Sequence, residues 1–126
     1  MKKISVIGIG KLGLCWALEL EKNGYDVLGC DVNKNYVDSL NNKSFKSFEP
    51  NVNEYLLDSI NFKATTDVLD TINFSDIIFV VVATPSLDNG KYDHQYLDNV
   101  INSVIKNSDN ISKKNIVVCC TTMPGH

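Results

Sequence analysis

Three glycines, Gly8, Gly10 and Gly13, interrupt an otherwise apolar stretch near the amino terminus, SVIGIGKLGLCWALEL (5–20). Their G-x-G-x-x-G spacing is that of a turn that binds a diphosphate. The first glycine permits a tight bend, the second lets phosphate approach the backbone, and the third lets strand and helix pack closely. The helix that follows would point its unpaired N–H groups and its partial positive end at the phosphates. The sequence therefore predicts an anion-binding turn here.

One carboxylate stands where it would complete a dinucleotide site. Asp31 ends a predicted strand, DVLGCD (26–31), at about the distance from the glycines at which such sites place an acid on the adenosine ribose. The same carboxylate would repel a 2′-phosphate, so the sequence favours NAD over NADP. An aspartate just before Asn33 is also typical of an ordinary turn at a helix start. Its pairing with the glycines favours the ribose role.

Composition restricts the other ligands. The 126 residues carry a net charge of −3 with the charges scattered along the chain, so no basic face for a nucleic-acid backbone is expected. All twelve cationic side chains are lysines, which removes the planar guanidinium that binds phosphate through two hydrogen bonds. A phosphate must therefore be held by backbone N–H groups or by lysine.

The amino terminus raises the question of a secretory signal or a membrane span, because Met1, Lys2 and Lys3 precede apolar residues. Lys11 and Glu19 break that apolar run, and no small-residue cleavage site follows it. A span would need roughly 20 unbroken apolar residues. We therefore expect a cytoplasmic chain with no membrane partner.

The four cysteines, Cys15, Cys30, Cys119 and Cys120, lack the spacing of a disulfide framework and of a zinc site. Free, buried thiols in a reducing compartment are expected, and no metal site.

Short β-branched apolar runs alternate with amphipathic stretches, which predicts a doubly wound parallel α/β sheet of the Rossmann type. The length fits one domain, residues 1–126, with a substantial core. Strands are expected at 3–9, 26–31, 62–66, within 75–85, and at 114–122, and helices at 12–23, 33–40, 52–60 and 94–107. The first and last strands are expected to be buried.

Further segments carry a family resemblance. FEPNVNEYL (48–56), SDIIFVVVATPS (75–86), DNGKYDHQYL (88–97) and CTTMPG (120–125) follow the glycine turn in that order. Over essentially the whole chain they resemble the NAD-binding domain of the UDP-glucose/GDP-mannose dehydrogenase family. That resemblance implies enzymes that oxidise a sugar C6 hydroxyl twice, to a carboxylate, with two NAD molecules and a covalent thiohemiacetal on a cysteine.

The resemblance also implies roles position by position. The cofactor pyrophosphate would be lined by Gly8, Gly10, Lys11, Leu12 and Gly13, and the adenosine ribose would be bound by Asp31. Further cofactor contacts would come from Val82, Ala83, Thr84, Pro85 and Ser86 after the fourth strand, where Pro85 also ends the strand. Thr121 would also contact the cofactor, and Thr122, near the nicotinamide and the reacting centre, is the candidate catalytic residue.

The sequence departs from the family pattern in places. Tyr36, with Lys34 nearby, stands where the family often has a basic residue, and the ending Met123-Pro124-Gly125-His126 does not align cleanly. His94 is expected to be a surface or capping residue and the terminal His126 to be mobile.

None of the four cysteines matches the family's nucleophile, so the substrate-binding and catalytic-cysteine domain is absent from these residues. We expect a truncated NAD-binding domain that binds NAD, meets its nucleotide-sugar substrate only with the missing C-terminal domain, and is inactive alone. Two alternatives stay open: a stand-alone NAD(H)-sensing regulatory module, and the NAD domain of a related hydroxyacid dehydrogenase.

Overall fold

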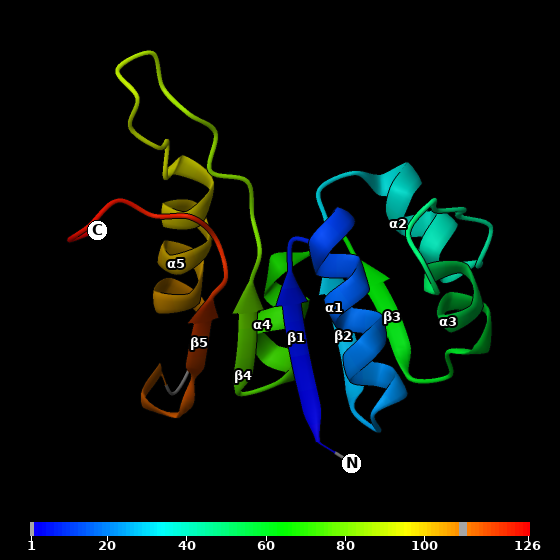
Figure 1. The fold of residues 1–126 in the computed structure, drawn as a ribbon. Helices are drawn as coiled ribbons and strands as arrows, with labels where there is room; N and C mark the ends of the chain where they lie inside the picture. The colour runs from blue at the N-terminus through cyan, green and yellow to red at the C-terminus, as the bar shows by residue number, and fades with distance from the viewer. Residues whose placement is uncertain (1, 109–110) are drawn as a thin grey trace.

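The structure, a computed structural model, describes residues 2–108 and 111–126 (Figure 1). Five strands form one sheet in the order β3-β2-β1-β4-β5, and every neighbouring pair is parallel. They are β1 (Lys3–Ile7), β2 (Asp26–Cys30), β3 (Phe62–Thr65), β4 (Ile77–Val80) and β5 (Asn115–Val118). The strand order reverses between β1 and β4. The predicted doubly wound parallel sheet is confirmed.

Helices cover both faces of this sheet. They are α1 (Lys11–Lys22), α2 (Lys34–Asn41), α3 (Val52–Asp58), α4 (Val68–Phe74) and α5 (Gln95–Asn107), with a short 3₁₀ turn, η1 (Ile111–Lys113). In Figure 1, α1 lies in front of the sheet and α4 behind it. None of the helices within the described residues is long and apolar enough to cross a membrane.

Alternate side chains of β1 supply the two cores. Val6 packs with Leu18 of α1 in a cluster that continues onto α2 and α3. Ile7 packs with Ile72 of α4 in a second cluster that continues onto α5. Because both faces of β1 are covered, the consecutive residues Val6 and Ile7 are both apolar and buried, and the expectation of a buried first strand is confirmed.

Helix α4 was not expected from the sequence. It has only seven residues, and just two of them, Thr71 and Ile72, are buried. Asp67 caps it by accepting a hydrogen bond from the N–H of Leu69 at 2.9 Å. The buried Ser5 hydroxyl of β1 donates to the carbonyl of Thr71 at 2.6 Å. A helix this short, fixed partly by polar contacts, leaves little apolar periodicity to detect.

The last strand is the main correction to the sequence prediction. β5 ends at Val118 and lies at the edge of the sheet, so Val117 and Val118 are 40% and 42% exposed rather than buried. Strand β4 ends at Val80, five residues before Pro85, so this proline does not end the strand. All four cysteines are free, but only Cys30 is fully buried and Cys119 is exposed.

The opposite edge of the sheet is protected by a side chain. The amide of Asn41, at the end of α2, donates to the carbonyl of Ala64 at 2.9 Å and accepts from its N–H at 2.8 Å. It thereby supplies both hydrogen bonds that a neighbouring strand would offer to that residue of β3.

Candidate functional site

The turn between β1 and α1 is built on two very close backbone contacts. Gly8 has φ +94°, and a Cβ atom on it would lie 2.5 Å from the carbonyl oxygen of Val81. A Cβ atom on Gly13 would lie 1.8 Å from the carbonyl oxygen of Gly8. These two glycines let the turn pack between α1 and the end of β4, as the spacing predicted.

Gly10 differs from the other two, because a Cβ atom built on it would meet no heavy atom within 4 Å. It occupies the N-cap position of α1, and its carbonyl accepts the first helical hydrogen bond, from Leu14 at 2.9 Å. Among the described residues no side chain caps this helix start. The first-turn N–H groups thus adjoin open space, which is the arrangement that binds phosphate.

A cavity of about 750 Å³ opens beside this turn. Five of the predicted site residues line it, coming from the ends of β1, β2 and β4: Gly8, Gly10, Asp31, Val82 and Ala83. The position agrees with the general rule that doubly wound sheets bind ligands at the carboxyl ends of strands where the strand order reverses.

The cavity also has walls that the sequence analysis did not identify. They include Val32, Val68, Tyr96, Asn99, Val100 and Ser103. The last four follow helical spacing along one side of α5, a pattern the sequence contained. Val68 starts the unexpected helix α4, so its position could not be anticipated.

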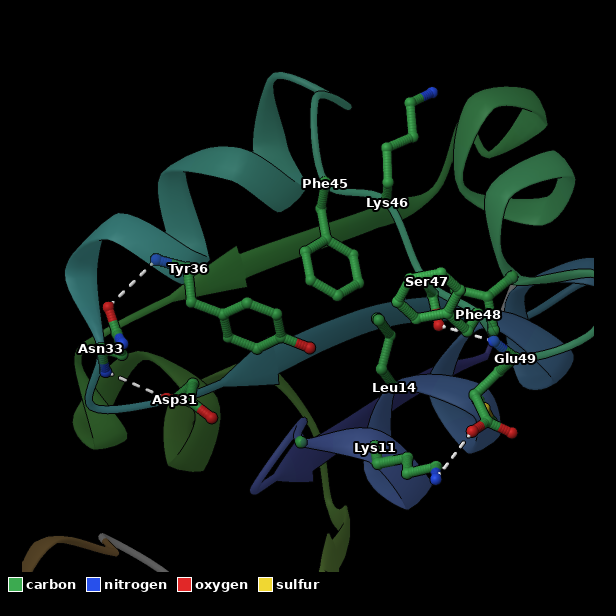
Figure 2. A pocket seen from close by; sticks show the side chains of 13 residues that line it. Lys11, Leu14, Asp31, Asn33, Tyr36, Phe45, Lys46, Ser47, Phe48 and Glu49 are labelled. Carbon is green, nitrogen blue, oxygen red and sulfur yellow. Dashed lines mark hydrogen bonds and ion pairs between the residues drawn. The ribbon is translucent and has the colours of Figure 1, made fainter.

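Asp31 stabilises the turn before α2 and also lines the cavity. Its Oδ1 accepts a hydrogen bond from the N–H of Asn33 at 2.9 Å, while Asn33 caps α2. Its own N–H donates to the carbonyl of Thr65 at 3.1 Å and ties it to β3. Figure 2 shows the second carboxylate oxygen pointing away from Asn33. The turn thus uses one carboxylate oxygen of Asp31 as a hydrogen-bond acceptor, and the other oxygen is not bonded to Asn33.

The side chain of Lys11 does not line this cavity. Its ammonium lies 2.9 Å from Glu49 Oε1 in the loop between α2 and α3 (Figure 2). The hydrogen bond and charge of Glu49 raise the pKa of Lys11. Both side chains line a second cavity of about 570 Å³, which shares Gly10 and Asp31 with the first.

Tyr36, which replaces the basic residue of the family pattern, supports the backbone instead. Its hydroxyl donates to the carbonyl of Ile9 at 2.5 Å, and its ring meets Phe45 edge to face at 5.1 Å. Burial, and secondarily the charge of Asp31, raises the pKa of Tyr36 to about 12. The side chain therefore stays a neutral donor that fixes the glycine turn.

The remaining predicted site residues do not line either cavity: Leu12, Gly13, Thr84, Pro85, Ser86, Thr121 and Thr122. Leu12 is 66% exposed. Ser86 bridges to Tyr92 within the long loop between β4 and α5, which extends beyond the carboxyl edge of the sheet in Figure 1. Thr121 and Thr122 are exposed in the segment after β5.

The cysteines near the site are not activated. Burial, together with the charge of Asp31, raises the pKa of Cys30 to about 11. Burial also raises the pKa of Cys15 and of Cys120. A nucleophilic thiol needs a lowered pKa, so these three are unsuited to covalent catalysis.

Comparisons with known proteins identify the family of the chain. The model of the UDP-glucose/GDP-mannose dehydrogenase family, NAD binding domain, matches residues 2–126. A GDP-mannose 6-dehydrogenase of Pseudomonas savastanoi pv. phaseolicola is 33% identical over 98% of this chain and 29% of its own length. A UDP-N-acetyl-D-mannosamine dehydrogenase of Methanococcus vannielii is 34% identical over the same shares.

Among solved structures, a ternary complex of GDP-mannose dehydrogenase from Pseudomonas aeruginosa superposes with a TM-score of 0.89 at 30% identity, over 97% of this chain and 29% of that one. The chain thus spans about 29% of the length of the curated relatives that it matches. With a family match over almost every residue and the same fold, this chain belongs to the UDP-glucose/GDP-mannose dehydrogenase family and is its NAD-binding domain.

Proposed function

We propose that the chain holds NAD in the cavity beside the glycine turn, as the cofactor domain of an enzyme that oxidises the C6 alcohol of a nucleotide sugar to a carboxylate. The observation that carries the proposal is the open start of α1 at Gly10, which lines the cavity, where a side chain would meet no atom within 4 Å and no side chain caps the helix. A diphosphate fits there without any arginine, because backbone donors and the helix dipole supply the attraction.

The adenosine half is proposed to lie between the ends of β2 and β4. The Asp31 oxygen that is not used by Asn33 would accept hydrogen bonds from the ribose hydroxyls. An adenine ring would lie against the apolar walls formed by Val32, Val68, Val82 and Val100. An aspartate at the ribose also disfavours the additional phosphate of NADP, so NAD is the proposed form.

The nicotinamide half is proposed to extend over β4 and β5. There the segments 84–86 and 121–122 are the candidates for contact, with Thr122 nearest the reacting centre. Bound NAD would supply the acceptor for the hydride that leaves the sugar carbon. The residues of this chain would orient the cofactor. A further part of the whole protein, outside these 126 residues, would bind the sugar and supply the catalytic cysteine.

The substrate class and the location follow from the same reasoning. The relatives named above act on nucleotide-linked hexoses, which supports a nucleotide sugar as the substrate of the whole protein. The 126 residues alone are proposed to bind NAD without oxidising sugar. The four free cysteines support a reducing compartment such as the cytoplasm.

Calorimetry tests the proposal directly. Titration of NAD into the folded chain should give a heat signal that fits one binding site. NADP should bind at least tenfold more weakly than NAD. Asp31→Ala should weaken NAD binding, whereas Asp58→Asn, at the far end of α3, should not. The proposal fails if millimolar NAD gives no binding signal while circular dichroism shows a folded protein.

A further inference from the structure

The segment after β5 is attached to the start of α5 by a histidine. His94, at the N-cap position of α5, accepts a hydrogen bond at Nε2 from the backbone N–H of Met123 at 3.1 Å. Acceptance at Nε2 requires that the imidazole be neutral with its proton on Nδ1. His94 is therefore more than a surface residue, because it holds a specific point of the chain 29 residues away.

Two further contacts fix the same segment. The rings of His94 and His126 stack with centroids 3.7 Å apart and planes 17° apart. Nε2 of His126 lies 2.7 Å from Oδ1 of Asp98 on α5. We call His94, Asp98, Met123 and His126 the His94 cluster. Within it, His126, which was expected to be mobile, contacts both His94 and Asp98.

The other end of the segment is attached to β4. The N–H of Cys119 donates to the carbonyl of Val80 at 2.8 Å, and the thiol of Cys120 lies 3.8 Å from the same oxygen. Thr121 and Thr122 thus lie between two fixed points, one beside β4 and one at the start of α5. Both threonines remain exposed to solvent.

We propose that His94 is a positioning residue for the nicotinamide half of the cofactor. Through Met123 it holds the backbone of Thr121 and Thr122 beyond the carboxyl ends of β4 and β5. The inference rests on the proposed function. A dinucleotide crosses a doubly wound sheet where the strand order reverses, so an adenosine half at Asp31, just after β2, leaves the nicotinamide half over β4 and β5.

The start of α5 does not depend on this contact. Oδ1 of Asp93 accepts from the N–H of Gln95 at 3.0 Å, and the N–H of Asp93 donates to the carbonyl of Pro85 at 2.7 Å. His94 makes no side-chain cap of its own. Its replacement should therefore leave α5 and the adenosine cavity in place while releasing the segment after β5.

Because the adenosine cavity should stay in place when His94 is replaced, the inference can be tested by comparing a ligand that contains only the adenosine half with the whole dinucleotide. ADP carries the adenosine half and the diphosphate, and NAD carries the nicotinamide half in addition. His94→Ala should weaken NAD binding about three- to tenfold, the effect expected from one lost hydrogen bond and a released segment. ADP binding should change less than twofold. His94→Gln, whose side-chain oxygen can accept the Met123 N–H, should restore NAD binding.

Calorimetry gives the affinities, and the emission of bound NADH reports on the nicotinamide ring itself. Circular dichroism checks that each variant is folded. The inference is overturned if His94→Ala weakens NAD and ADP equally, if it weakens neither, or if wild-type protein binds NAD no more tightly than ADP. Wild-type protein that binds neither ligand would instead refute the proposed cofactor site.

Discussion

The carbonyl oxygen of Gly8 occupies the space that a side chain on Gly13 would need, at 1.8 Å from an ideal Cβ position. The obstructing oxygen belongs to the backbone and a Cβ position is fixed by the backbone, so no rotamer change can relieve the clash. We predict that Gly13→Ala lowers the free energy of unfolding by about 3 kcal/mol or more, at or beyond the upper end of ordinary overpacking costs. Urea denaturation measures it. Gly10→Ala, which meets no atom, is the control and should cost less than about 1 kcal/mol.

Gly10→Ala should instead affect the ligand. Its methyl group would project into the space in which the proposed diphosphate approaches the first turn of α1. We predict at least a tenfold loss of affinity for both NAD and ADP, since they share that diphosphate. Asn35→Ala, an exposed change on α2 away from the cavity, provides the comparison by calorimetry. Unchanged binding by the Gly10 variant would remove the diphosphate from this turn.

The pairing of Lys11 with Glu49 predicts a substitution that tightens NAD binding instead of weakening it. Lys11 is the first residue of α1, where a cation opposes the helix dipole, and its ammonium lies 2.9 Å from Glu49 in the second cavity. Glu49→Gln should free this cation for the diphosphate. NAD binding should then tighten about two- to fivefold and become more sensitive to salt.

The double variant Lys11→Met, Glu49→Gln provides the control for that effect. Removing the lysine should abolish both the gain in affinity and the added salt dependence, returning NAD binding to near the wild-type value. A Glu49→Gln protein that binds NAD as weakly as wild type at low salt contradicts the prediction.

The sequence could predict those parts of the site that depend on short patterns of neighbouring residues. The glycine spacing located the turn, because a tight bend and close packing both exclude side chains. The spacing from the glycines located Asp31, because it directly follows β2, the strand next to β1. The amphipathic pattern of α5 located that helix, although its contribution of Tyr96 to the cavity wall was missed.

What the sequence could not predict depends on the order of strands in space. The exposure of Val117 follows from β5 lying at the sheet edge, and no local pattern records which strand has only one neighbour. Similarly, the family resemblance implies that Lys11 lies at the pyrophosphate, but it indicates no protein partner for the side chain. Its partner Glu49 is 38 residues away and becomes visible only once the loop between α2 and α3 is placed.

The capped edge of the sheet provides a stability test. Asn41 makes two hydrogen bonds to the backbone of Ala64, at 2.8 and 2.9 Å. Asn41→Ala should lower the free energy of unfolding by about 1–2 kcal/mol, because it removes both bonds and leaves the β3 groups to water. Asn35→Ala on the same helix is the matched control. Equal midpoints of thermal unfolding for the two variants would show that the edge needs no cap.

The buried thiol of Cys30 should make the folded chain less stable as the pH becomes alkaline. Burial, with a smaller contribution from Asp31, raises its pKa to about 11 in the folded chain, whereas a cysteine in an unfolded chain ionises near pH 8.5–9. Between these values the unfolded chain loses the proton and the folded chain keeps it. The stabilising effect is therefore complete below about pH 8.5 and is lost as the pH rises toward 11, with a slope of up to about 1.4 kcal/mol per pH unit.

The measurement is the difference in unfolding free energy between wild type and Cys30→Ala at several pH values from 7 to 11, because lysines and tyrosines titrate in both proteins and cancel. Cys30→Ala also removes a buried thiol, so it should be the less stable protein at pH 7. The gap should narrow with rising pH, since only wild type has a buried thiol to ionise on unfolding. Cys119→Ala, which removes an exposed thiol, provides the comparison variant. A gap that stays constant through pH 11 would mean that Cys30 ionises as easily in the folded chain as in the unfolded one.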